Sequence, residues 1–458
     1  MASLRISQVG VRGVVGRGGI TARHVLDFGA AFATFLATEG PVVIARDPRA
    51  SGLMLREGLV AALLAAGRDV IDLGIASTPV IQHTIRQRQA AGGVSISASH
   101  NAAEWNALKF FGPLGTYLTT AEADELLDIY HLRRFYAAPW NKLGRVEMDN
   151  SAIDRYLDEL SEVFHFDRLR QFRVVVDCSN GTSSRILRRL NERFGFSLIL
   201  INAAMDGRFA HEPSTSARVV GLQLAPLVQP LSADAGFLFD ADSDRVAFAT
   251  ELGEPASEEL ILPMLSDYLL PRSEGKIVLT NLSTTSLNEE VASWHGGKVV
   301  RVPVGRNAAI DALNAHRPEQ IALAGEGTGA VMMPQFRFVY DGIATMLTLL
   351  EKSAAREQPL SQLVAALPGY SMLKGEVPLN RHRIPQLLEL LATSFGEVSI
   401  NRQDGLRVDL PSGRWGDNAW FHVRVSQTEP FVRVITEARG AAPQDLFDEV
   451  METTRAHA

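Results

Sequence analysis

Short apolar strands that alternate with helices, and that each run into a polar loop, constrain the fold of this chain more than any other feature. Near the N-terminus, "PVVIARD", "DVIDLG" and "GVSISA" are short apolar runs typical of buried strands. "SGLMLREGLVAALLAAG" and the segment from Thr21 to Gly40, with Val25, Phe28 and Phe32 at helical spacing, are predicted helices that each end at a glycine. Strands that alternate with helices indicate a layered α/β domain.

The same pattern recurs twice along the chain. Strands followed by polar loops return in "FRVVVDCSNGTSS", "FSLILIN" and "AGFLFDADSDR", and again in "GKIVLTNLSTTS", "GKVVRVPVGRN" and "IALAGEGTG". After Gly369 the chain becomes rich in strands and turns, with a helix predicted from about Ala442. We therefore predict three similar layered α/β domains and a C-terminal α+β domain, at residues 1–148, 149–250, 251–368 and 369–458. Ligands are expected at the loops after the strands.

Composition narrows the functional classes. The 458 residues, 46% of them hydrophobic, suffice for several cores. The net charge is -7 without long blocks of like charge, which argues against a nucleic-acid partner. Cys178 is the only cysteine, so no internal disulfide can form, which fits a reducing compartment. The N-terminus lacks the apolar core of a secretory signal, and no run resembles a membrane span, so we expect a cytoplasmic protein.

Three aspartates follow the apolar strand in "AGFLFDADSDR". In an extended chain Asp240, Asp242 and Asp244 would point to the same side. Because close carboxylates repel one another, a hard cation such as Mg²⁺ is their natural counter-ion. Two other interpretations stay open: a solvated turn, and a calcium loop, although Arg245 stands where that loop needs glycine. We favour a catalytic metal site, followed by a strand at "VAFAT".

The stretch "GVSISASHNAAEWNALKFF" begins as a buried strand and stops at Ser99, His100 and Asn101. Read alone, such residues are typical of a turn or a helix cap. A hydrolase nucleophile elbow is a further interpretation, but "SASHN" lacks the flanking glycines of that motif. In extended backbone His100 would point away from Ser99. Lys109 is either a proton donor and acceptor or an exposed surface amine.

Two later loops carry groups suited to a phosphorylated ligand. In "AGEGTGAVMMP", glycines alternate with Glu326 and Thr328, so backbone and polar side chains can approach ligand hydroxyls. "HVRVSQTEPFVRV" combines hydroxyls with arginine forks around a turn, a set that suits phosphate. Its candidate residues are Arg424, Ser426, Thr428 and Arg433. Read in isolation, each loop is equally well a polar turn.

Taken together and in order, these segments resemble the α-D-phosphohexomutase family over nearly the whole chain. The resemblance is carried by "VRGVVG", "ARDPRAS", "SASHN", "DADSDR", "GEGTG" and "SQTEP". It implies four domains around a central cleft, each contributing one loop. It also implies an isomerase, an intramolecular phosphotransferase that moves a phosphoryl group between the 6 and 1 positions of a hexose phosphate through a hexose 1,6-bisphosphate.

The resemblance further implies a role for each residue that matches a family motif. Ser99 would carry the phosphate, and together with Asp240, Asp242 and Asp244 would hold one Mg²⁺. The other catalytic residues implied are Lys109 as general acid/base, Arg12, His100 and Arg245. Substrate contacts are implied for Glu326 and Thr328 at the sugar, and for Arg424, Ser426, Gln427, Thr428 and Arg433 at the distal phosphate.

Within the family, "EWNALKFF" and the "GEGTG" loop look most like phosphoglucosamine mutases of archaeal and related bacterial type. Glucosamine 6-phosphate is therefore the expected substrate, with a phosphomannomutase or phosphoglucomutase as the alternative. The chain departs from the family pattern at Ala102, Asn307, Ala330 and Gln427. These departures leave open a sugar-phosphate binding protein with little turnover, and a phosphoserine exposed to water would give a phosphatase. We expect hexose phosphates as partners, no nucleic acid or membrane, and a monomer or homodimer.

Overall fold

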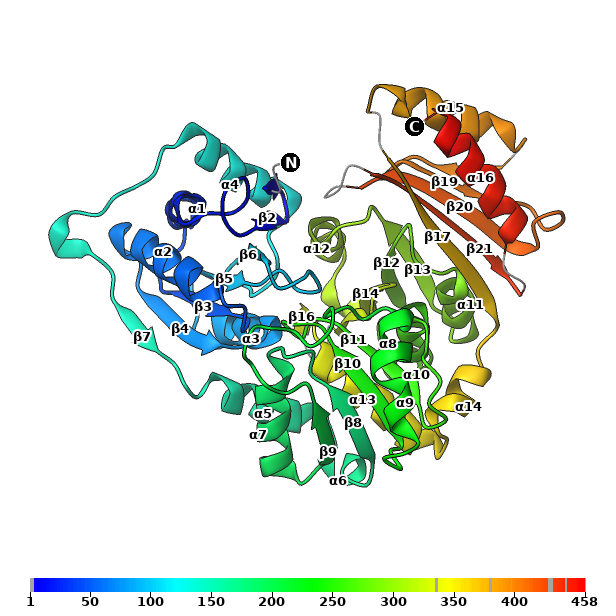
Figure 1. Ribbon diagram of the computed structural model, residues 1–458, viewed down its shortest axis with the longest axis horizontal. Coiled ribbons are helices and arrows are strands. Elements are labelled where there is room, and N and C mark those ends of the chain that lie inside the picture. The colour runs from blue at the N-terminus through cyan, green and yellow to red at the C-terminus, as the bar shows by residue number, and fades with distance from the viewer. Residues whose placement is uncertain are drawn as a thin grey trace.

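The computed structural model describes residues 4–333, 337–378, 381–396, 398–426, 431–440 and 443–457. It contains four separate sheets (Figure 1). We call the parts of the chain built on these sheets domains 1 to 4. The predicted fold class is confirmed: three α/β domains precede a C-terminal domain with an antiparallel sheet. The boundaries between the domains stay predictions, although the strands of each sheet fall within one predicted domain.

Domain 1 is built on a seven-stranded sheet in the order β1-β2-β6-β5-β3-β4-β7. Its strands β5, β3, β4 and β7 are parallel, whereas β1, β2 and β6 pair antiparallel. Its elements are β1 Arg5–Ser7, β2 Gly10–Val14, α1 Ala22–Phe35, β3 Val42–Arg46, α2 Gly52–Ala65, β4 Val70–Ile75, α3 Thr78–Gln87, β5 Gly92–Ile96, β6 Trp105–Phe111, α4 Thr120–Leu132, η1 Trp140–Lys142 and β7 Val146–Met148.

Helix α1 has Thr21, the first residue of the predicted segment, as its N-cap, but it ends at Phe35 instead of continuing to Gly40. The guanidinium of Arg68 lies beside the segment after this end. It donates hydrogen bonds to the carbonyl oxygens of Leu36 and Thr38. Both carbonyls lie beyond the helix, so a side chain distant in the sequence holds the segment that leaves it.

Domain 2 has a four-stranded sheet in the order β11-β10-β8-β9. Its elements are α5 Ala152–Val163, α6 Phe166–Leu169, β8 Arg173–Asp177, α7 Ser183–Phe194, β9 Ser197–Ile201, α8 Ala217–Gln223, α9 Ala225–Val228, β10 Ala235–Phe239 and β11 Val246–Thr250. The strand predicted at "VAFAT" is therefore confirmed, and it pairs antiparallel with β10.

Domain 3 has a five-stranded sheet in the order β13-β12-β14-β15-β16. Its elements are η2 Glu258–Leu260, α10 Ile261–Leu269, η3 Leu270–Arg272, β12 Ile277–Asn281, α11 Leu287–Trp294, β13 Lys298–Val302, α12 Arg306–Asn314, η4 Pro318–Gln320, β14 Ile321–Glu326, β15 Ala330–Met333, β16 Arg337–Tyr340, α13 Gly342–Arg356 and α14 Leu360–Ala365.

Domain 4 has an antiparallel sheet in the order β17-β21-β20-β19-β18. Helices α15 and α16 cover the face of this sheet that points away from domain 3 (Figure 1). Its elements are β17 Tyr370–Pro378, η5 Arg381–Arg383, α15 Ile384–Ser394, β18 Ser399–Asn401, β19 Leu406–Asp409, β20 Asp417–Val425, β21 Phe431–Arg439 and α16 Gln444–His457.

One apolar cluster runs continuously through domains 1, 2 and 3. It includes Val43 of β3, Tyr156 of α5, Phe237 of β10 and Ile343 of α13, all of them fully buried. The apolar core of domain 4 is a separate cluster between its sheet and its two helices. The first three domains therefore share one core, and hydrogen bonds such as that from Arg407 Nη1 to the carbonyl oxygen of Leu282 join domain 4 to domain 3.

Candidate active site

The loop between the antiparallel strands β5 and β6 carries Ser99 and His100. Ser99 has a φ of +52°, in the left-handed region that residues other than glycine rarely adopt. The bend this produces brings His100 Nδ1 to 3.5 Å from Ser99 Oγ. The expectation that His100 points away from Ser99 is therefore wrong, because it assumed an extended backbone.

The loop between β10 and β11 carries the three aspartates. Ligand oxygens of Asp240, Asp242 and Asp244 all lie within 4.8 Å of one another. The carboxylates do converge, but through a turn with Ser243 at a φ of +61° instead of the extended chain we expected. The backbone N–H of Arg245 donates to Asp240 Oδ1 at 3.2 Å and fixes that side chain at the exit of the turn.

The two loops meet at the boundary between domains 1 and 2. Ser99 Oγ donates a hydrogen bond of 2.5 Å to Asp240 Oδ2. Lys109, on β6, is buried and not the surface amine of the alternative interpretation. Its Nζ lies 2.5 Å from Asp242 Oδ2 and 3.1 Å from Asp244 Oδ2. A hydroxyl, an ammonium and three carboxylates are thus assembled from strands that are far apart in the sequence.

The charged groups of this cluster shift one another's pKa values. Burial, together with Asp244 and Asp242, raises the pKa of Asp240 well above its usual value. Burial also opposes ionisation of Asp244, but Arg306, Lys109 and Arg245 hold its pKa far below the usual range. Burial works against the Lys109 ammonium too, yet the two carboxylates raise its pKa above the ordinary value. The cluster therefore holds both signs of charge away from water.

His100 behaves differently. Burial, followed by the neighbouring cations Arg245 and Arg12, lowers its pKa well below the usual value. Arg245 Nη1 lies 3.1 Å from His100 Nδ1, which fits a neutral ring that accepts there. Arg12 Nη1 donates to Asn101 Oδ1 at 3.3 Å, at the far side of the same loop. His100 and Asn101 thus face arginines.

Arg306 completes the cluster, and we did not predict it as a site residue. Its Nη2 lies 2.7 Å from Asp244 Oδ2, and its Nη1 donates to the hydroxyl of Tyr117. The neighbouring Asn307, one of the predicted departures from the family pattern, donates to the carbonyl oxygen of Leu118 at 2.8 Å. The sequence did contain a signal for Arg306, because it is the basic residue next to the departure at Asn307.

A cavity of about 240 Å³ opens onto Ser99 and Lys109. It is lined from all four domains: Arg12 and His100 come from domain 1, Arg245 from domain 2, and Arg433 from domain 4. Domain 3 contributes Arg306 and Glu326. The cavity therefore combines five arginines, a lysine and a histidine with one carboxylate, which suits a phosphorylated ligand with hydroxyl groups.

The predicted sugar and phosphate loops lie around this cavity. Glu326 accepts from the hydroxyl of Tyr340 at 3.3 Å and from Thr328 Oγ1 at 3.4 Å. Arg433 lines the cavity and pairs with Glu376 at 3.2 Å.

The rest of the predicted phosphate loop lies next to a contact between domains 3 and 4. Arg424 Nε donates to Asp404 Oδ2 at 2.9 Å, and the same oxygen accepts from the backbone N–H of Val304 at 3.0 Å. Ser426 is buried, and its N–H donates to the carbonyl oxygen of Phe431. Gln427 and Thr428 lie outside the described residues.

The donor set of the triad fits a divalent cation. Asp242 Oδ1 and Asp244 Oδ1 are buried and, among the described residues, have no hydrogen-bond partner. Buried carboxylate oxygens without partners are costly, and hard cations such as Mg²⁺ bind through oxygen ligands of this kind. The residues present could therefore hold a metal ion.

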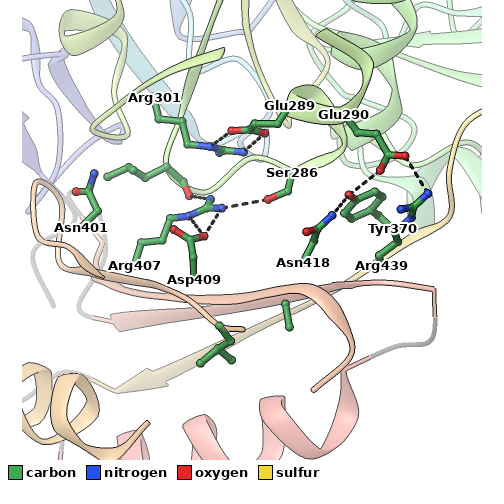
Figure 2. Close-up of a pocket in the computed structure, with 13 residues that line it drawn as sticks. Ser286, Glu289, Glu290, Arg301, Tyr370, Asn401, Arg407, Asp409, Asn418 and Arg439 are labelled. Carbon is green, nitrogen blue, oxygen red and sulfur yellow. Dashed lines mark hydrogen bonds and ion pairs between the residues drawn. The ribbon is translucent and has the colours of Figure 1, made fainter. Parts of the chain in front are cut away.

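A larger pocket, of about 610 Å³, lies between domains 3 and 4 and includes neither Ser99 nor Lys109. Figure 2 shows that its arginines already face acidic partners: Arg301 pairs with Glu289 at 2.7 Å, and Arg439 with Glu290 at 2.9 Å. This pocket is larger than the cavity at Ser99, but volume does not identify the active site, since further pockets of about 670 Å³ and 690 Å³ lie elsewhere on the described part of the protein. We favour the smaller cavity, because Ser99 and Lys109 line it and both are hydrogen-bonded to the buried aspartates.

Comparison with known families decides the assignment. Models of phosphoglucomutase/phosphomannomutase alpha/beta/alpha domains I, II and III match residues 5–137, 154–253 and 258–370. The chain belongs to this family. The predicted resemblance to phosphohexomutases is thereby confirmed, and with it the class of enzyme, isomerases that transfer a phosphoryl group.

Individual members of the phosphoglucomutase/phosphomannomutase family match nearly the whole chain. A phosphoglucomutase/phosphomannomutase of Thermococcus kodakarensis is 32% identical over 94% of this chain and 93% of its own. A "Probable phosphoglucosamine mutase" of Pyrococcus abyssi is also 32% identical, over 94% and 92%. The crystal structure of a family protein from Burkholderia thailandensis superimposes with a TM-score of 0.83 at 25% identity, over 99% and 97% of the two chains.

No helix among the described residues is long and apolar enough to cross a membrane. The predicted compartment and oligomeric state stay predictions.

Proposed function

We propose that this chain is an active phosphohexomutase that converts glucosamine 6-phosphate to glucosamine 1-phosphate, with Ser99 as the phosphoryl carrier. The observation that supports this most is the hydrogen bond of 2.5 Å from Ser99 Oγ to Asp240 Oδ2. It places a hydroxyl against a buried acidic triad and beside a buried lysine, at the floor of a cavity lined by arginines.

Asp240, Asp242 and Asp244, together with the phosphate on Ser99, are the proposed Mg²⁺ ligands. When bound, such an ion supplies positive charge to the oxygens of the transferring group, where negative charge spreads in the transition state. Arg12, Arg245 and Arg306 add fixed positive charge from three domains. Because these groups are preorganised and largely buried, they need little rearrangement during the reaction.

The proposed reaction has two mirror-image steps. First, the bond between phosphorus and Ser99 Oγ breaks as a bond to a sugar hydroxyl oxygen forms, which gives a hexose 1,6-bisphosphate. The net proton movement is from the sugar hydroxyl to Ser99 Oγ, and Lys109 is the proposed relay, since it lines the same cavity. The bisphosphate then turns end over end and returns its other phosphate to Ser99, with the proton moving back.

The remaining proposed residues hold the sugar during these steps. Glu326 and Thr328 would bind the sugar hydroxyls or the amino group, because Glu326 lines the cavity and Thr328 Oγ1 donates to Glu326 at 3.4 Å. Arg433, with Arg424, Ser426, Gln427 and Thr428, would hold the phosphate that is not reacting. Binding of this distal phosphate would orient the sugar hydroxyl that reacts at Ser99.

A coupled assay with glucosamine, mannose and glucose phosphates tests the proposal, with Mg²⁺ and a hexose 1,6-bisphosphate present. We expect isomerisation, fastest with glucosamine 6-phosphate, and a phosphate on the Ser99 peptide by mass spectrometry. Ser99→Ala should lose both. Preference for mannose or glucose phosphate would establish the alternative substrate, which the names of the two relatives leave open. Binding without isomerisation would identify a binding protein, and release of inorganic phosphate a phosphatase.

A further inference from the structure

Arg49 is fully buried and makes contacts that bear directly on Ser99. It follows β3 in the "ARDPRAS" segment of domain 1. Its Nη2 donates to the carbonyl oxygens of Ser99 at 2.9 Å and Asn101 at 2.7 Å. Its Nη1 donates to those of Ala102 and Trp105, the latter at 3.1 Å. The loop from Ser99 to Trp105 is therefore wrapped around one guanidinium.

The remaining donor of that guanidinium is matched as well. Arg49 Nε donates to Asp47 Oδ2 at 2.9 Å, and both side chains are fully buried. An arginine has five N–H donors in a fixed planar fork, and here each one has an acceptor. A lysine offers three donors around a point charge, so it cannot reproduce this set.

The other side of Ser99 is held by the same network. The N–H of Ser99 donates to Ser97 Oγ at 3.0 Å, and Ser97 Oγ donates to Asp47 Oδ2 at 2.7 Å. The carbonyl of Ser99 thus reaches Arg49 directly, and its N–H reaches Asp47 through Ser97. The positive φ of Ser99 is kept by contacts on both of its peptide groups.

Residues of domain 2 cover this network and shield it from solvent. Arg49 Cζ lies over the Phe209 ring, 4.7 Å from the ring centroid. A Cβ at Gly207 would lie 2.5 Å from the carbonyl oxygen of Pro48, so the two segments approach as closely as backbone allows. Water is thereby kept from the guanidinium, which strengthens its hydrogen bonds.

We propose that Arg49 is a positioning residue for phosphoryl transfer, which fixes the backbone of the Ser99 loop so that Oγ is presented to the acidic triad. Arg49 does not line the cavity itself and acts through the loop. The inference rests on the proposed function of Ser99. Because in-line transfer depends on geometry, a displacement of Oγ by about 1 Å is expected to lower kcat about 100-fold.

The test compares Arg49→Lys with Arg56→Lys, the same substitution at a half-buried ion pair of domain 1 with Asp72. Steady-state kcat and KM are measured with a hexose phosphate and Mg²⁺, and phosphate uptake on Ser99 from glucose 1,6-bisphosphate is followed by intact mass. We expect Arg49→Lys to lower kcat and the uptake rate about 100-fold, with KM within about threefold of the wild type. Arg56→Lys should behave as wild type.

Ser97→Ala gives a second, smaller change in the same network, and it decides the matter if Arg49→Lys does not fold. A fall in its kcat at unchanged KM and melting temperature supports the inference. An unchanged kcat in Ser97→Ala, or in a folded Arg49→Lys, overturns it. A rise in KM alone would assign Arg49 to binding and would also overturn it. Wild-type protein that neither takes up phosphate nor isomerises any substrate would instead overturn the proposed function.

Discussion

The carboxylate of Glu259 occupies the space that any side chain at Gly327 would need. A Cβ at position 327 would lie 2.1 Å from Glu259 Oε2. Glu259 is buried, accepts from the N–H of Thr285 at 3.1 Å, and pairs with Lys374 of domain 4 at 2.8 Å. The predicted sugar loop of domain 3 therefore rests on a carboxylate that is held from domain 4.

Gly327→Ala is expected to destabilise the protein by about 1–3 kcal/mol and to lower kcat/KM for every hexose phosphate, because the sugar loop must shift to clear Glu259. Glu259→Ala removes the obstacle, so the double variant should lose less than the sum of the two single variants. Urea unfolding and steady-state kinetics measure both effects. Gly369→Ala is the control, since a Cβ there meets nothing within 4 Å. Additive losses would contradict the contact.

Removal of metal is expected to lower the melting temperature. An ion that binds only the native state adds about 2.7 kcal/mol at a concentration one hundred times its Kd. Thermal unfolding in Mg²⁺ and in EDTA measures this difference. Asp242→Asn should abolish it, because a buried ligand oxygen is lost, whereas Asp167→Asn, at a largely exposed carboxylate, should retain it. A shift that survives in Asp242→Asn would place the ion elsewhere.

Arg306→Met should destabilise the metal-free protein by about 3–5 kcal/mol, because it leaves the buried Asp244 carboxylate without its nearest arginine. Mg²⁺ should restore part of this stability, since the ion supplies the missing positive charge. Urea unfolding in EDTA and in Mg²⁺ tests both statements. Arg317→Met, at an exposed arginine of the same domain, is expected to change stability by less than about 0.5 kcal/mol. Equal losses with and without Mg²⁺ would show that Arg306 is not coupled to the metal.

Acidification is expected to weaken the contact between domains 3 and 4 at His422. Burial lowers the pKa of this histidine to about 4. Arg424 and Arg407 also lower it, whereas Asp404 raises it. Its Nδ1 lies 2.9 Å from Ser283 Oγ of domain 3. Between pH 6.5 and pH 4 His422 is protonated in the unfolded chain but stays neutral in the native protein. The contribution of the neutral ring to the free energy of unfolding is therefore full above pH 6.5 and decreases as the pH falls.

The loss between pH 7 and pH 5 should be about 2 kcal/mol in urea unfolding. His422→Gln should flatten that part of the pH profile, because no titrating ring remains. His131→Gln changes an exposed histidine of α4 and should leave the profile as in the wild type. An identical slope in His422→Gln would assign the pH dependence to other groups.

The sequence predicted the layered domains well, because strand and helix periodicities are local signals and the polar loops follow directly from the strands. It also indicated Ser99, Asp240 and Lys109 by their motifs. It could not show that Arg306 reaches Asp244, or that Arg49 holds the Ser99 loop, because both contacts join residues that are distant in the sequence. The positive φ values at Ser99 and Ser243 were equally hidden, since neither residue type favours that conformation.

The separate apolar core of domain 4 has a consequence for how this chain can diverge. A substitution in the shared core of domains 1 to 3 is felt by all of them, so the loops that hold Ser99 and the aspartates must change in concert or not at all. Domain 4 is free of that constraint. Side chains of domain 4 that contact a ligand can therefore change in evolution while the residues around Ser99 stay the same. The enzyme could then accept new substrates with the same reaction.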